Sequence, residues 1–163
     1  MKEERIEIPK PQGHNCFACG TANPIGLNLQ FYRLGDTVCS DITLGKHYEG
    51  WQNVSHGGII STLLDEVMSW TIMYFKKLFF LTRKMEVKYI RPIMTGTPLT
   101  IRGKLLDGSE PPKIKVRAEI LDDHGHLLAR SIGEFIVLPK DKMSSVPEGM
   151  KEEILQLYEN FPE

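Results

Sequence analysis

The sequence predicts an α+β fold in which an antiparallel sheet wraps around one long central helix. Residues 59–74 have the apolar periodicity of a helix, and period-two alternation marks strands before and after this segment. Short turns separate the strands, which makes neighbouring strands antiparallel. A sheet with one polar face must bury its other face, and the apolar half of the helix is the largest surface available to cover it.

The composition is that of an ordinary globular protein, and we expect one domain over residues 1–163. The chain is 41% hydrophobic and 25% charged. Its net charge is -1 and its 20 lysines and arginines are spread along the chain, which argues against a nucleic-acid partner. The first residues hold no apolar signal core and no later run is long enough to cross a membrane, so we expect a cytoplasmic protein with no membrane partner.

Residues 1–26 are predicted to be irregular, because prolines and glycines interrupt them. They contain Cys16 and Cys19, whose spacing invites a zinc site. A structural zinc needs about four ligands, and only His14 lies near the pair in the sequence. We therefore expect packed thiols with no metal and no cofactor, in preference to zinc or a redox pair, and the odd number of cysteines argues against a disulfide framework.

A hairpin precedes the helix, because apolar residues alternate with polar ones over residues 27–32 and 37–43, around a Gly35-Asp36 turn. In the helix, a step of 100° per residue gathers the apolar side chains into one half-circle: Ile59, Ile60, Leu63, Leu64, Val67, Met68, Trp70 and Tyr74. The polar side chains fall in the opposite arc, called here the polar arc: Ser61, Thr62, Asp65, Glu66 and Ser69. We expect the apolar half to be core and the polar arc to be the place for chemistry.

The segment Ser55-His56-Gly57-Gly58 leads into the helix. Ser55 is expected to cap it, and the two glycines let a ligand approach the first-turn N–H groups closely. The front of the helix is therefore predicted to be an open anion site.

Four more strands follow the helix, at residues 85–89, 97–106, 114–120 and 127–138. Residues 139–163 are predicted to be a polar tail with a short amphipathic helix around residues 151–158. Such a sheet leaves its edges and the polar arc of the helix uncovered. Pairing with a second copy closes them, so we expect a homodimer or homotetramer.

This order of elements, with His56-Gly57-Gly58, with Asp65 nine residues after His56 and with Tyr89-Ile90-Arg91-Pro92 closing the next strand, resembles the hotdog-fold acyl-CoA thioesterases of the phenylacetyl-CoA thioesterase (PaaI-like) type. The resemblance covers about residues 16–138. Its Cys-x-x-Cys-Gly and Asn-Pro-x-Gly-Leu opening, at residues 16–27, looks like one recurrent subgroup of that family.

The resemblance implies hydrolysis of an acyl-CoA, without a cofactor or metal. Negative charge builds on the thioester oxygen, and the N–H of Gly57 at the helix N-terminus is expected to polarise that carbonyl. Asp65, acting from the opposing subunit, is expected to serve either as general base on water or as nucleophile. His56 is expected to orient the thioester or to hold the loop.

Three further residues are candidates for substrate binding. Gly58 leaves room for the ligand, and Arg91 is either a solvated strand-end residue or a contact for CoA phosphate. Many relatives carry an asparagine six residues before the histidine, where this chain has Gly50. Either Asn53 brings its amide to the same place, or this branch works without it.

Two alternatives from other functional classes stay open, a non-catalytic acyl-CoA binding or sensing protein and a hotdog dehydratase or hydratase. The second is disfavoured, because His56-Gly57-Gly58 is not the expected placement of its histidine. We also expect Glu66 to form a surface or interface ion pair, and Trp51 and Trp70 to lie in the core or an interface.

Overall fold

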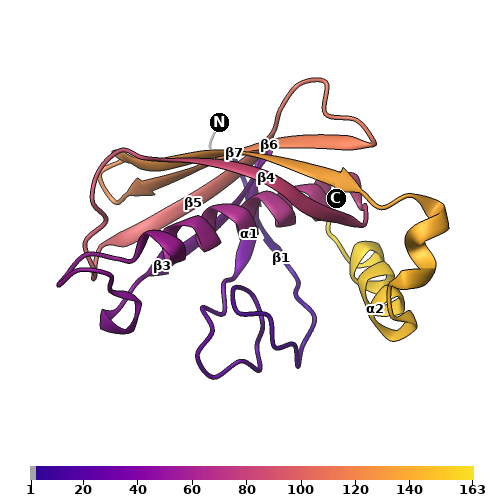
Figure 1. Cartoon of the computed structure of the whole chain (residues 1–163), viewed down its shortest axis with the longest axis horizontal. Coiled ribbons are helices and arrows are strands. Elements are labelled where there is room, and N and C mark those ends of the chain that lie inside the picture. Colours follow the sequence, from indigo (N-terminus) through magenta and orange to yellow (C-terminus); the bar gives the residue numbers. More distant parts are fainter. Residues whose placement is uncertain (1–2) are drawn as a thin grey trace.

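The computed structural model describes residues 3–163, as a curved sheet with one long helix lying along one face (Figure 1). The strands are β1 (Arg5–Ile8), β2 (Phe31–Leu34), β3 (Thr37–Thr43), β4 (Phe80–Tyr89), β5 (Pro98–Leu105), β6 (Lys113–Asp122) and β7 (Leu127–Val137). The helices are α1 (Gly57–Lys76), α2 (Glu148–Glu159) and the short 3₁₀ helices η1 (Lys46–Tyr48) and η2 (Lys140–Ser145). The predicted fold class, an antiparallel sheet around one long helix, is confirmed.

The described strands form one antiparallel sheet in the order β1-β2-β3-β5-β6-β7-β4. β3 and β4 flank α1 in the sequence but lie far apart in the sheet, so α1 crosses the faces of β5, β6 and β7 between them. β1 and β4 are the edges of this sheet. Edge strands carry unpaired backbone groups, which makes β4 a place where another strand can add.

Two glycines let α1 lie close to the sheet. A side chain at Gly103 in β5 would collide with the Thr71 hydroxyl, and a Cβ at Gly133 in β7 would lie 2.9 Å from the Met68 sulfur. Most of the apolar half of α1 is buried against the sheet, with Leu63, Val67 and Met68 at 0% exposure. Such a close approach of the helix to a strand requires glycine in the strand, because a side chain there would collide with the helix.

The predicted helix is confirmed, although it starts two residues earlier than expected, at Gly57. It ends at Lys76, where Lys77 adopts the left-handed conformation (φ 52°) and its N–H bonds to Ile72 and Met73 oxygens. A residue in the left-handed conformation directly after the last helical residue commonly ends a helix.

The prediction that residues 1–26 are irregular is wrong at β1. Ile6 and Ile8 alternate there with charged residues, and the strand pairs with β2 at the sheet edge. The strand predicted at residues 27–32 starts only at Phe31, because Asn28 has a positive φ of 48°. Met1 and Lys2 lie outside the described residues.

The C-terminal segment docks onto the far end of α1. Its helix α2 is longer than the predicted 151–158, and the Tyr158 hydroxyl donates to the Leu78 carbonyl at 2.6 Å. The Tyr74 hydroxyl of α1 donates to the Pro162 carbonyl at 2.6 Å. Among the residues from 3 onward, no helix is long and apolar enough to cross a membrane.

Candidate active site

His56 caps the front of α1. Its backbone is extended, and its Nδ1 accepts a hydrogen bond from the Gly58 N–H at 2.8 Å. A ring nitrogen that accepts carries no proton, so the neutral imidazole keeps its proton on Nε2. The expectation that Ser55 is the cap is wrong, because the helix begins one residue too late for it. The buried Ser55 hydroxyl has no hydrogen-bond partner within the described chain.

Gly57 is the first residue of α1, and its N–H is free for a ligand. The Gly58 N–H is bound by His56, and the N–H groups of Ile59 and Ile60 donate to the His56 carbonyl at 3.0 and 3.1 Å. No acceptor for the Gly57 N–H exists among residues 3–163. This donor lies at the positive end of the helix dipole.

A cavity of about 340 Å³ opens beside this helix start. It is lined by Val54, Ser55, Gly57, Ile60, Tyr89, Ile90, Arg91, Pro92 and Ile93. The Tyr89 hydroxyl donates to the Gly57 carbonyl at 2.9 Å and contacts the Ser61 hydroxyl at 2.7 Å, which ties the end of β4 to the helix. Arg91 is exposed and forms no ion pair with any described residue. The structure therefore brings Gly57 and Arg91 together in one cavity.

Asp65 lies farther along α1, beside the edge strand. Its Oδ1 accepts a hydrogen bond from the Thr82 hydroxyl of β4 at 3.1 Å. Burial raises the pKa of this carboxyl, and the Thr82 hydrogen bond opposes the rise. Eight residues of helix separate Asp65 from Gly57, a rise of about 12 Å, so one chain does not bring the two groups together.

Asn53 belongs to the turn before the helix and not to the cavity lining. Its φ is +63°, a conformation that asparagine tolerates, and its carbonyl accepts the Thr95 N–H at 2.9 Å. A Cβ at Gly50 would lie 3.2 Å from the His56 Cα, so a side chain there would press on the capping residue. The structure therefore places Asn53 outside the cavity and packs His56 against Gly50.

Glu66 does not form the expected surface or interface ion pair with a described lysine or arginine. Its Oε1 accepts the Trp70 indole N–H at 3.0 Å, and Trp70 is 2% exposed and stacked on Phe31 with ring centroids 4.4 Å apart. Burial, followed by the nearby Cys16, raises the pKa of Glu66 to about 7. The predicted core position of Trp70 is correct, whereas Trp51 is 85% exposed.

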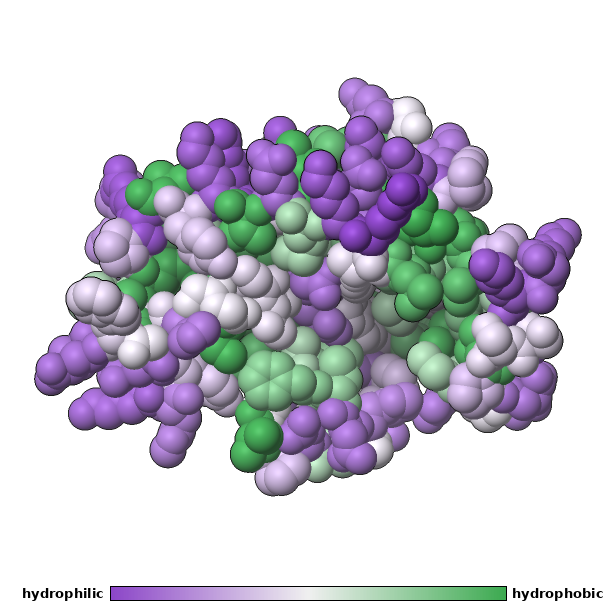
Figure 2. Space-filling model, in the orientation of Figure 1, coloured by the Kyte–Doolittle hydropathy of each residue, from purple (hydrophilic) through white to green (hydrophobic). Residues whose placement is uncertain are grey.

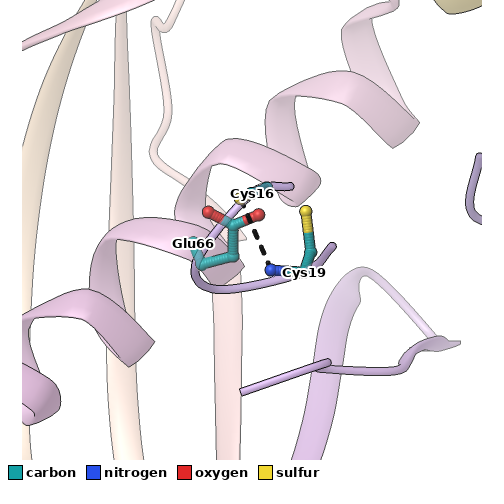
Figure 3. Close-up of side chains that lie close together, drawn as sticks. All are labelled: Cys16, Cys19 and Glu66. Carbon is teal, nitrogen blue, oxygen red and sulfur yellow. Dashed lines mark hydrogen bonds between the residues drawn. The ribbon is translucent and has the colours of Figure 1, made fainter. Parts of the chain in front are cut away.

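Glu66 also meets the two cysteines of the N-terminal turn, a contact that the sequence analysis missed (Figure 3). A hydrogen bond from Cys19, together with backbone N–H groups of the turn, lowers the pKa of Cys16 to about 5. The hydrogen bond with Cys16, followed by burial, raises the pKa of Cys19. The residues come from distant parts of the sequence, so spacing offered no signal for the third member.

An apolar cavity of about 410 Å³ lies at the other end of α1. Figure 2 shows apolar side chains around a hollow at the end of the molecule where α2 lies. Met73 of α1 and Leu81 of β4 contribute to its lining, and Leu81 is the neighbour of Thr82, which holds Asp65. Apolar space of this size suits the apolar part of a small ligand.

Comparison with known proteins agrees with this architecture. Residues 52–129 match the family model "Thioesterase superfamily". Verlamelin biosynthesis protein B of Lecanicillium sp. is 29% identical over 111 residues, which are 52% of this chain and 44% of that protein. The chain thus spans less than half the length of this curated relative.

Solved structures with the same fold include protein RHA08564, a thioesterase superfamily protein (TM-score 0.65, 27% identity, 71% of this chain and 56% of that chain). The PaaI protein from the phenylacetic acid degradation operon of E. coli has a TM-score of 0.63 (15% identity, 69% and 81% covered). A hypothetical thioesterase protein with coenzyme A from Streptococcus pneumoniae TIGR4 has a TM-score of 0.59 (17% identity, 63% and 81% covered). The resemblance seen in the sequence is confirmed: residues 52–129 match the thioesterase superfamily, and the chain has the hotdog fold of the PaaI-type thioesterases.

Proposed function

We propose that this chain is an acyl-CoA thioesterase, which hydrolyses a thioester to a free acid and CoA and works as a homodimer or homotetramer. One observation carries the proposal: Gly57, whose N–H is unpaired at a helix N-terminus, lines a cavity, and it lies on the same helix as the half-buried Asp65. The match of residues 52–129 to the thioesterase superfamily supports it.

The Gly57 N–H suits the electrostatic demand of thioester hydrolysis. As a nucleophile adds to the carbonyl carbon, negative charge grows on the carbonyl oxygen, and a preorganised donor there stabilises the transition state. The helix dipole adds to this stabilisation. A Cβ at Gly57 would lie 3.5 Å from the Tyr89 hydroxyl, an ordinary van der Waals contact, so alanine fits at this position and keeps the N–H.

We infer that Asp65 reaches this carbonyl through pairing of the edge strand β4 with a second copy. Thr82 of β4 binds Asp65, and Tyr89 of the same strand binds Gly57. Antiparallel pairing of β4 with β4 of a second copy, centred between Met85 and Glu86, would put Thr82 opposite the partner's Tyr89. Asp65 of each subunit would then face the partner's Gly57, and each active site would be built from two chains.

Asp65 acts in one of two ways. As general base it takes a proton from water, whose oxygen attacks the carbonyl carbon, and the C–S bond then breaks as the thiol of CoA leaves. As nucleophile its carboxylate attacks the carbonyl carbon and expels CoA as a thiolate. Water then hydrolyses the resulting anhydride to the free acid and the Asp65 carboxylate, and this step releases the proton that the thiolate takes up. Burial raises the pKa of Asp65, which makes its carboxylate a stronger base in either role.

The CoA part of the substrate is proposed to lie along the cavity rim. Arg91 is exposed there without an ion-pair partner among the described residues, and a guanidinium suits a phosphate. Gly58 is proposed to leave space for the ligand at the helix start. The coenzyme A bound to the Streptococcus pneumoniae protein of the same fold supports CoA as the ligand class.

A panel of acyl-CoAs, from acetyl to long-chain and aryl, tests the proposal by release of free thiol. We expect turnover of at least one class, with a preference for acyl groups that fill apolar space. Tight binding of acyl-CoA with no thiol released from any member would instead indicate a non-catalytic binding protein. Hydration of enoyl-CoA without thiol release would indicate the hydratase alternative.

A further inference from the structure

Three side chains on the polar arc side of α1 converge on one point. The sulfur atoms of Cys16 and Cys19 and a carboxylate oxygen of Glu66 all lie within 4.8 Å of one another (Figure 3). Ligands of a single tetrahedral zinc ion, bound at about 2.3 Å for sulfur and 2.0–2.2 Å for oxygen, lie roughly 3.5–3.8 Å apart. The cluster therefore needs only small side-chain movements to hold one ion.

The turn that carries the two cysteines suits metal-bound thiolate. The Cys19 N–H donates to the Cys16 sulfur at 3.4 Å, and the Gly20 N–H donates to the Cys16 carbonyl at 2.9 Å. A side chain at Gly20 would collide with the backbone of His14 and Cys16, so the tight turn requires glycine here. Backbone N–H groups directed at a sulfur stabilise its negative charge.

The surroundings of Glu66 and Cys19 resemble the outer shell of a metal site. The Trp70 indole holds Oε1 of Glu66, which fixes the carboxylate and leaves its second oxygen for the sulfurs. The Lys10 ammonium donates to the Cys19 carbonyl at 2.8 Å. Two thiolates and one carboxylate around a divalent ion leave one net negative charge, which Lys10 balances.

We propose that Cys16, Cys19 and Glu66 bind one zinc ion, with a water molecule in the fourth position. Two soft thiolate ligands favour zinc over magnesium or calcium, and three protein ligands plus water is a common zinc coordination. The ion would join the turn between β1 and β2 to α1. The sequence predicts no metal, because only His14 lies near the two cysteines along the chain. In the fold, His14 Nε2 lies 3.1 Å from a carboxylate oxygen of Glu153, whereas Glu66 supplies the third ligand.

Zinc titration of the full chain tests this proposal. The protein is reduced, stripped with a chelator and titrated with zinc alone, and cobalt substitution reports thiolate coordination through its charge-transfer absorption. We expect about one ion per chain and a higher Tm with zinc, because the ion binds only the folded state. Cys16→Ser and Cys19→Ser should lower the affinity at least 100-fold, and Glu66→Gln should lower it roughly 10–100-fold.

Cys39→Ser is the matched control. Cys39 is buried in β3 and is not a member of the cluster, so this variant should leave zinc affinity unchanged. Glu66→Gln keeps the acceptor for Trp70 and so stays informative if a cysteine variant fails to fold. The proposal is overturned if the reduced wild type binds less than a tenth of an equivalent of zinc. A Cys16–Cys19 disulfide in protein whose reduced form binds no zinc would identify a redox pair instead. Thioesterase activity is a separate measurement, so either proposal can fail alone.

Discussion

Asp65 and Glu66 are consecutive residues of α1, yet the fold gives their carboxylates different surroundings. Asp65 lies beside Thr82 of the edge strand, on which the proposed dimer pairs. Glu66, turned by about 100° around the helix, lies against the N-terminal turn with Cys16 and Cys19. Burial raises the pKa of both carboxyls. The polar arc therefore contributes to two sites: Asp65 belongs to the proposed thioesterase site and Glu66 to the proposed zinc site.

The largest effect is expected from Asp65→Asn. This change keeps the size of the side chain but removes its charge and basicity, so kcat should fall by about 10²–10⁴ whether Asp65 is base or nucleophile. The rate is measured with the best acyl-CoA of the panel, and circular dichroism and sedimentation check fold and assembly.

Asp123→Asn is the matched control for this substitution. Asp123 is exposed in the turn between β6 and β7, so the same chemical change should leave kcat unchanged there. Equal rates for Asp65→Asn and wild type would remove Asp65 from the mechanism.

The next effect is expected at the front of the helix, from Gly57→Pro. Proline removes the N–H, fits the first position of a helix, and accepts the extended backbone of His56 before it (φ -64°, ψ 134°). Loss of this one donor should lower kcat by about 10²–10³. Gly57→Ala keeps the N–H and is the control that measures the side chain alone. If both variants turn over equally, the N–H is not the carbonyl donor.

The smallest effect on rate is expected from Glu66→Gln. Glutamine still accepts the Trp70 N–H, so kcat should stay within about tenfold of wild type while zinc affinity drops. Both quantities are measured on the same preparation. A loss of kcat as large as that of Asp65→Asn would show that the two carboxylates serve one site. It would contradict the separate roles given to Asp65 and Glu66.

Most of the fold could be predicted because its signals are local. Alternation and helical periodicity identified the hairpin, α1 and the later strands, since each follows from neighbours a few residues apart. The short edge strand β1 was missed, because Ile6 and Ile8 alone alternate there amid charged residues. The cap was misplaced by one residue, because serine and histidine both accept hydrogen bonds and only the backbone geometry decides between them.

Only part of the candidate site could be predicted, because local sequence patterns report only residues that lie near one another in the chain. Gly57 and Asp65 lie on one helix, so their spacing was visible in the sequence. The meeting of Glu66 with the cysteines depends on how the N-terminal turn packs on α1, which no local pattern reports. The position of Asn53 in the turn before the helix depends on its positive φ, which the sequence pattern does not report.

The most direct test of the central claim, an active site shared between two chains, is a mixed oligomer of two impaired variants. Asp65→Asn and Gly57→Pro chains are co-expressed with different affinity tags and purified through both tags. A heterodimer then keeps one site with an intact Gly57 from one chain and an intact Asp65 from the other, so about half of the wild-type activity should return. Activity that stays at the level of the separate variants would contradict a shared site.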